Sequence, residues 1–157
     1  MRAVIPVLVS LAWLGACGGS SHGQPEQANR DSIQADSAAL ASKAFDSTVF
    51  DTITWKKEGA DTARGSVVYR VSCVRCHGED GAGVKNAVFR GDTLNVPSFL
   101  GPDWALADSP MVLRKLIFVG DSTGMPHFGI IGLHYRDVDA VARYIMKDLR
   151  AGDTKKK

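Results

Sequence analysis

The spacing of apolar residues predicts helices at three places after residue 60. The first covers residues 62–72, with Asp61 in the position of an N-cap. At helical spacing it places three residues on one face, namely Gly65, Tyr69 and Cys73.

The second predicted helix follows Ser109-Pro110, a pair typical of an N-cap and a first helical residue, and it ends at Gly120. Its apolar positions are Leu113, Leu116 and Ile117. The third begins near Tyr135 or Arg136 and ends before Gly152, and its apolar positions are Val138, Val141, Ala142 and the stretch from Ile145 to Leu149.

The segments between and before these helices are polar. Residues 78–101 are rich in Gly, Asp, Asn and Pro, so we expect a loop there and an all-α fold. Residues 18–44 contain few large apolar side chains, which predicts a disordered tether with a marginal helix over 31–45. Residues 49–55 alternate in polarity, which predicts an extended segment that can pack onto the following domain.

The first residues have the pattern of a secretory signal. A positive Met1-Arg2 start precedes an apolar stretch over residues 3–14, too short to span a membrane. The stretch ends in Leu14-Gly15-Ala16-Cys17, which resembles a bacterial lipobox. That resemblance implies cleavage after residue 16 and a lipid on Cys17. An ordinary signal peptide or an uncleaved anchor remains the alternative.

Charge and cysteine content narrow the function classes. The 19 basic and 17 acidic residues nearly balance, which argues against nucleic acid as a partner. Residues 154–157, which end in Lys155-Lys156-Lys157, are expected to be a solvated tail. Of the three cysteines, Cys17 is assigned to the lipid, which leaves two for other chemistry.

Those two lie in Cys73-Val74-Arg75-Cys76-His77, the attachment motif of c-type haem. The spacing suits this chemistry because residues three and four apart lie on one helical face. Cys73 and Cys76 can form thioethers to haem while His77 binds its iron. A redox-active pair would be expected within a βαβ unit, and a zinc site would need a second ligand pair, but no cysteine follows.

Residues 61–149 resemble class I cytochrome c, a small all-helical fold around one covalent haem. The resemblance rests on the haem motif, the helix order and the spacing of Gly65, Tyr69 and Cys73. It implies that Gly65 lets the last helix cross closely, with Tyr144 and Val141 packed at the crossing. We therefore divide the chain into a signal peptide (1–16), a lipidated tether with the extended segment (17–58), a cytochrome c domain (59–153) and the tail (154–157).

The same resemblance implies a methionine as the second axial ligand, in a loop before the last helix. Met125 in Gly124-Met125-Pro126 occupies that place. A thioether is a soft, neutral ligand that raises the reduction potential. Met111 and Met146 fall inside predicted helices and are expected in the core. His127 is close enough in sequence to compete, whereas His134 is expected at the N-terminus of the last helix.

The resemblance further implies that the carbonyl of a loop proline accepts a hydrogen bond from the axial histidine. Pro97 matches that position, although it could instead only shape a turn. The family often opens its last helix with a Ser-Asp cap. Here the stretch is His134-Tyr135-Arg136-Asp137, so we expect a poorly capped helix.

With both axial positions filled by the protein, iron has no open site for a substrate. The sequence thus predicts a non-enzymatic, membrane-tethered electron carrier with respiratory or dehydrogenase redox partners in the periplasm. By resemblance to lipoprotein sorting, Gly18 in place of an aspartate favours the outer membrane in a host that has two membranes. Two alternatives stay open. One is a fixed subunit of a larger oxidoreductase, attached through residues 46–55, and the other is a haem protein that reacts with peroxide or gas.

Overall fold

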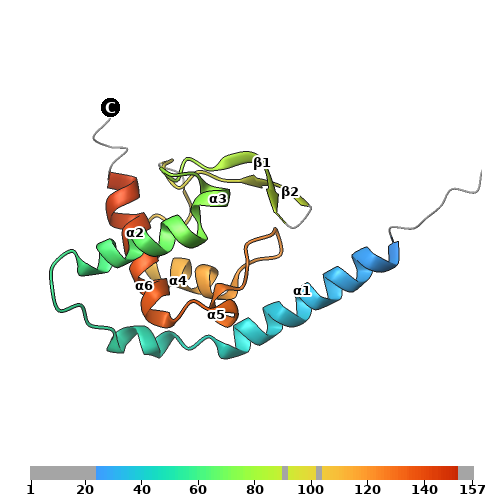
Figure 1. Cartoon of the computed structure of the whole chain (residues 1–157). Helices are drawn as coiled ribbons and strands as arrows, with labels where there is room; N and C mark the ends of the chain where they lie inside the picture. Colours follow the sequence, from blue (N-terminus) through green and yellow to red (C-terminus); the bar gives the residue numbers. More distant parts are fainter. Residues whose placement is uncertain (1–23, 90–91, 102–103, 152–157) are drawn as a thin grey trace, which may run out of the picture.

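The computed structural model describes residues 24–89, 92–101 and 104–151. Figure 1 shows a body of helices with a β-hairpin along one side and a long helix that extends away from it. In chain order the elements are α1 (Gln24–Ala44), the 3₁₀ helix η1 (Ser47–Thr52), α2 (Ala60–Ser72), α3 (Val74–His77), β1 (Val84–Phe89), β2 (Asp92–Val96), α4 (Pro110–Val119), α5 (Phe128–Ile131), α6 (Tyr135–Tyr144) and the π-helical turn η2 (Ile145–Leu149). The expected helical fold class is confirmed.

The crossing of α2 and α6 forms the centre of the fold. Gly65 lies at the contact, where an added Cβ would overlap the carbonyl oxygen of Ala140 and lie 2.6 Å from Cβ of Tyr144. One turn further on, the rings of Tyr69 and Tyr144 are 5.6 Å apart. The predicted glycine crossing is therefore confirmed.

A single apolar core joins α2, α4 and α6. Burying one large apolar side chain stabilises a fold by about 1.5–3 kcal/mol. The helical residues of this core are Val68, Tyr69, Leu113, Ile117, Phe118, Val138, Val141, Ala142 and Ile145. Most of them were predicted to face inwards from their helical spacing.

The starts of two helices, α4 and α6, agree with the sequence predictions, and the start of α2 differs. Helix α4 begins at Pro110 and ends before Gly120, and α6 begins at Tyr135 with His134 as an N-cap that makes no side-chain hydrogen bond. The prediction of Asp61 as the N-cap of α2 is wrong, because the helix begins at Ala60 after a left-handed Gly59. A left-handed residue is easily supplied by glycine, so α2 starts two residues earlier than predicted.

The prediction of a loop over residues 78–101 is also wrong in part. Strands β1 and β2 pair antiparallel, from Val84 opposite Val96 to Phe89 opposite Asp92. The register shifts between Val84 and Ala87, and Asn86 there has a positive φ of 55°. Such a bulge breaks the alternation by which a strand is recognised from sequence.

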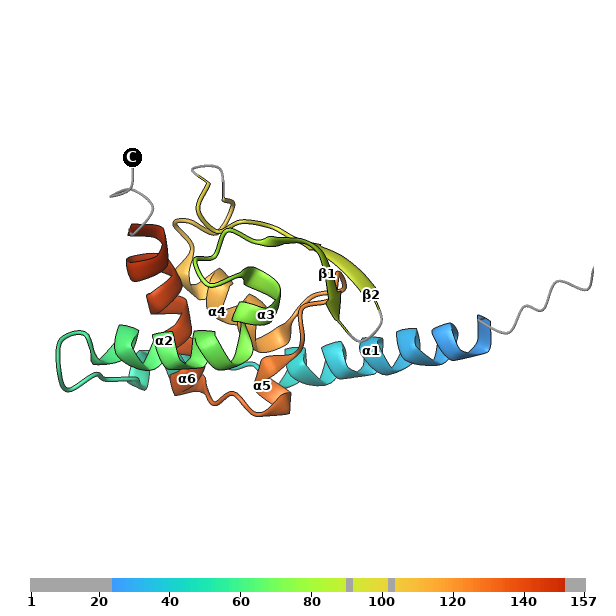
Figure 2. The same ribbon diagram turned by 45° about the horizontal axis from the view of Figure 1, so that its top comes forward.

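Helix α1 is longer than the marginal helix predicted over 31–45, since it begins at Gln24. Residues 24–44 are therefore helical and not coil, while residues 1–23 and 152–157 lie outside the described residues, with the signal sequence, Cys17 and the basic tail. Figure 2 shows α1 running past the body near α5. Within the described part of the chain, no helix is both long and apolar enough to cross a membrane.

The segment after α1 packs onto the body, as expected, but it is not extended throughout. Residues 47–52 form η1, capped by Asp46, whose carboxylate accepts hydrogen bonds from the Thr48 amide (2.9 Å) and hydroxyl (2.7 Å). Phe50 is buried, and its ring lies 5.2 Å from that of Tyr135. The Tyr135 hydroxyl accepts from the Asp46 amide and donates to the Ala44 carbonyl, both at 2.7 Å.

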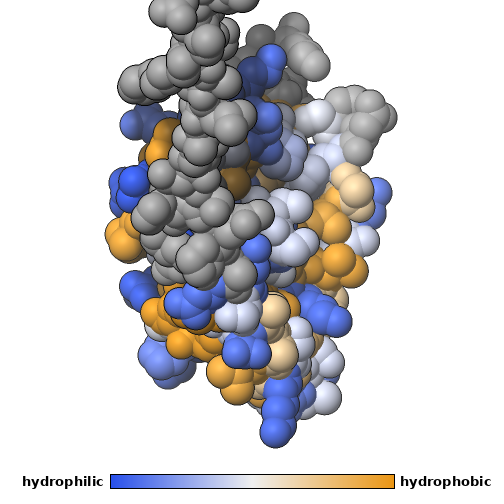
Figure 3. Space-filling model, turned by 90° about the vertical axis from the view of Figure 1, so that its right-hand side faces the viewer, coloured by the Kyte–Doolittle hydropathy of each residue, from blue (hydrophilic) through white to orange (hydrophobic). Residues whose placement is uncertain are grey.

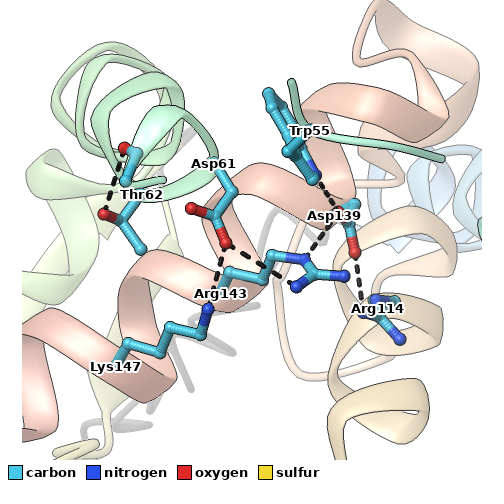
Figure 4. A network of polar contacts seen from close by, with 8 residues as sticks. Trp55, Asp61, Thr62, Arg114, Asp139, Arg143 and Lys147 are labelled. Atoms are coloured by element: carbon cyan, nitrogen blue, oxygen red, sulfur yellow. Dashed lines mark hydrogen bonds and ion pairs between the residues drawn. The ribbon is translucent and has the colours of Figure 1, made fainter. Parts of the chain in front are cut away.

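A polar network fixes this segment and α4 to α6 (Figure 4). Its centre is the fully buried Asp139, which accepts a hydrogen bond from the Trp55 indole at 2.8 Å. The same carboxylate forms ion pairs with Arg114 at 2.6 Å and Arg143 at 2.8 Å. Arg143 also lies 3.6 Å from Asp61, which in turn pairs with Lys147 at 3.1 Å.

Candidate haem-binding site

The Cys73–His77 motif forms one tight turn. Cys73 ends α2, and its carbonyl accepts hydrogen bonds from the amides of Cys76 (3.1 Å) and His77 (2.9 Å). Gly78 then stops α3 with a φ of 77°. Both cysteines carry free thiols. The structure thus places the three predicted residues, Cys73, Cys76 and His77, on one turn.

A tyrosine from α2 holds this turn in place. The Tyr69 hydroxyl donates a 2.7 Å hydrogen bond to the Gly78 carbonyl. The ring is fully buried, and burial raises the pKa of Tyr69, so the hydroxyl stays a proton donor at neutral pH. Sequence reasoning assigned Tyr69 to the helix crossing but missed this hydrogen bond to the haem motif.

The environment of Cys73 does not suit a redox-active dithiol. Burial, together with the neighbouring Cys76, raises the pKa of Cys73 to about 12. Redox-active cysteines need a lowered pKa, because the thiolate is the reacting species. Within the described residues no group of three or more His, Cys, Asp or Glu side chains could hold a metal ion.

His77 has the properties of a haem ligand. Its ring stacks on Phe99, with centroids 4.5 Å apart. Burial lowers the pKa of His77 to about 4, against the opposing charge of Asp121, so the imidazole is neutral at pH 7. Nδ1 is buried and has no hydrogen-bond partner among the described residues. A neutral imidazole beside two free thiols, with an unsatisfied buried nitrogen, fits covalent haem and its iron.

Pro97 lies close to this turn without bonding to His77 directly. The amide of Gly83 donates to the His77 carbonyl at 3.0 Å. Gly83 in turn lies against Pro97, since an added Cβ would be 2.9 Å from the Pro97 carbonyl oxygen. The role of this carbonyl as an acceptor for His77 stays a prediction.

Met125 lies in the loop between α4 and α5, where it packs in part against the apolar core. Strand β2 reaches this loop, because a Cβ on Gly124 would be 2.8 Å from Cδ1 of Leu94. The charge of Asp121 in the same loop acts on His77. The hairpin and the loop therefore frame one region around His77, but Met125 as a ligand stays a prediction. Met111 and Met146 lie within α4 and η2.

The other candidate ligand, His127, is held by the backbone. It is 5% exposed, and its Nδ1 forms a hydrogen bond with the Val119 carbonyl. Its Nε2 is buried without a partner among the described residues. A pocket of about 290 Å³ lies between α1 and this part of the loop, lined in part by Asp121 and His127. His134 is exposed at the start of α6, as expected.

Comparison with known proteins identifies the family. Residues 60–145, a little over half of the chain, match the family described as cytochrome C oxidase, cbb3-type, subunit III. Searches of curated proteins and of solved structures gave no match. The matched region begins at α2 and ends just after α6, so it contains the whole haem motif and the Met125 loop. A cytochrome c domain of this type binds haem c covalently and transfers electrons. The chain therefore belongs to the cbb3-type subunit III family of c-type cytochromes.

Proposed function

We propose that the protein is a membrane-tethered monohaem electron carrier that exchanges single electrons with respiratory or dehydrogenase partners outside the cytoplasm. In this proposal Cys73 and Cys76 bind haem through thioethers, and His77 and Met125 are the axial ligands. Cys17 carries the lipid that holds the protein at a membrane, with the outer membrane favoured. Cytochrome c domains are usually extracytoplasmic, which agrees with this placement.

The observation that carries the proposal is the state of His77. Its imidazole stacks on Phe99 and is partly buried, with a buried Nδ1 that has no partner among the described residues, and it follows one cysteine by one residue and the other by four. Haem c supplies an iron that cycles between two oxidation states. His77 and Met125 would fill both axial positions of the iron and exclude water. No position would then be left at which a substrate could bind the iron.

The experiment compares Met125→Ala with Met111→Ala in protein matured with haem. The wild type should show the weak far-red absorption band of methionine-ligated ferric haem and a one-electron redox titration. Met125→Ala should lose the band, bind added ligands and have a lower potential, because a soft ligand is removed. Met111→Ala should keep the band, since Met111 lies within α4. A band that persists in Met125→Ala would refute the axial pair.

A second candidate function is a haem c subunit fixed in a larger oxidoreductase. The family description favours it, because it names a subunit of an oxidase. Residues 46–55 are a poor means of attachment, since Phe50 is buried and Trp55 bonds to Asp139 within the same chain. Pull-down of the full chain from gently solubilised membranes separates the candidates: a stoichiometric oxidase would support the subunit, and a lone cytochrome the carrier.

A further inference from the structure

We propose that Asp121 is a positioning residue that holds Met125 in place for iron. This inference rests on the proposed function, because it concerns the ligand assigned there. Asp121 follows the end of α4, and Met125 lies four residues later in the same loop. The carboxylate would act through the backbone of Met125 and touch neither haem nor iron.

The hydrogen bonds of Asp121 fix Met125 on both sides. Its Oδ1 atom accepts from the amide of Met125 at 3.1 Å, while its own amide donates to the Met125 carbonyl at 3.2 Å. The same oxygen accepts from the amide and the hydroxyl of Thr123, both at 2.8 Å. One carboxylate oxygen therefore organises the whole turn that presents the methionine.

The surroundings of the turn leave it little room to adopt another shape. Gly120 has a φ of 73°, and an added Cβ would lie 2.8 Å from the Pro126 carbonyl oxygen. On the other side Gly124 lies against Leu94 of β2. Within this close-packed turn the Asp121 side chain adds a second hydrogen bond to the Met125 backbone, at its amide, beside the backbone bond to its carbonyl.

The chain contains a matched control. The tripeptide Asp-Ser-Thr occurs at 46–48 and again at 121–123. In both copies the aspartate Oδ1 accepts hydrogen bonds from the amide and the hydroxyl of the threonine. The first copy caps η1. The second differs because the same oxygen also bonds to the amide of Met125.

The experiment must separate geometry from charge, since the charge of Asp121 also acts on His77. Asp121→Asn keeps an oxygen acceptor at the same place and removes the charge. Asp121→Glu keeps the charge and moves the acceptor by one methylene. Asp121→Ala removes both, and Asp46→Ala removes the matching turn elsewhere. Each variant is matured with haem, and its affinity for added imidazole is measured together with the far-red band.

We expect Asp121→Ala and Asp121→Glu to bind imidazole about ten-fold more tightly than the wild type, the change that corresponds to about 1.4 kcal/mol. Their far-red band should also disappear at a lower temperature. Asp121→Asn and Asp46→Ala should behave as the wild type does. If Asp121→Ala does not incorporate haem, the comparison of Asp121→Glu with Asp121→Asn decides the question.

Two results would overturn the inference while leaving Met125 as a ligand. The first is wild-type imidazole affinity in all three Asp121 variants. The second is an imidazole affinity that follows the charge at position 121, so that Asp121→Glu matches the wild type and Asp121→Asn does not. Absence of the far-red band in the wild type would instead refute the axial pair, and the positioning role with it.

Discussion

The side chain of Asp139 joins three separate parts of the fold. Its carboxylate is fully buried, yet it bonds to Trp55 before α2, Arg114 on α4 and Arg143 on α6. Arg114 is itself only 14% exposed. A buried charge is tolerated when its partners are present, and removing one partner leaves the others unpaired in a poorly solvated place.

We expect Asp139→Ala to lower the free energy of unfolding by about 3–5 kcal/mol, the range for breaking a buried ion pair. Asp137→Ala is the matched control on the same helix. Asp137 is 14% exposed, but its partner Arg64 is 50% exposed and stays solvated when the pair is broken, so the loss of Asp137 should cost only about 1 kcal/mol. Urea unfolding of the two haem-loaded variants measures the difference. Equal losses would mean that the Asp139 network adds no more than a surface pair.

At the scale of single residues, the sequence predicts the role of a residue when its partners are close in sequence, and misses it when they are distant. Cys73, Cys76 and His77 are neighbours in sequence, and their turn is formed by local hydrogen bonds. Asp139 and Trp55 are 84 residues apart. Nothing near either residue indicates the other, because burial of a charged side chain depends on the assembled fold.

At the scale of elements, the crossing of α2 and α6 depends on the absence of a side chain at Gly65. Gly65→Val should therefore destabilise the fold by about 1–3 kcal/mol or more through overpacking. Ala63→Val, on the exposed side of the same helix, should cost less than about 1 kcal/mol because only helix propensity changes. Thermal unfolding followed by circular dichroism measures both. Similar midpoints for the two variants would contradict the crossing as a close contact.

The elements also show where periodicity is informative. Helices α4 and α6 repeat apolar residues at helical spacing between recognisable ends, so their positions were predicted well. The hairpin was missed because its bulge at Asn86 disturbs the alternation and its glycine-rich flanks resemble a loop. Helix α1 was underestimated for another reason. Ile33 and Leu40 are exposed, so it lacks the apolar stripe by which helices are recognised.

Among the residues that the structure describes, the surface gives no second indication of a membrane contact. Exposed large apolar side chains occur on several elements, among them Val71, Val88, Val112 and Ile131. On the face in Figure 3 the apolar groups are separated by polar ones among the coloured residues. Membrane attachment therefore depends, in the proposal, on the lipid at Cys17.

If the lipid on Cys17 is the membrane anchor, loss of this cysteine should release the protein from the membrane. In a bacterium that processes lipoproteins, Cys17→Ser should move the protein from the membrane to the soluble fraction while haem incorporation is unchanged. The separation is expected because two or more acyl chains anchor a protein stably. Ser20→Ala is the control and should stay with the membrane. Mass spectrometry of the N-terminal peptide checks the modification directly, and an unmodified N-terminus would refute the lipid anchor.

The attachment of α1 at its C-terminal end has a consequence for orientation. Tyr135 fixes Ala44 and Asp46, and Ala41 is buried, so the helix leaves the body in one direction. A residue inserted before Ile33 would move the outer end of this rod by about 1.5 Å and turn it by about 100°. For a protein held near that end, the length of α1 would determine how far from the membrane the haem-bearing body lies.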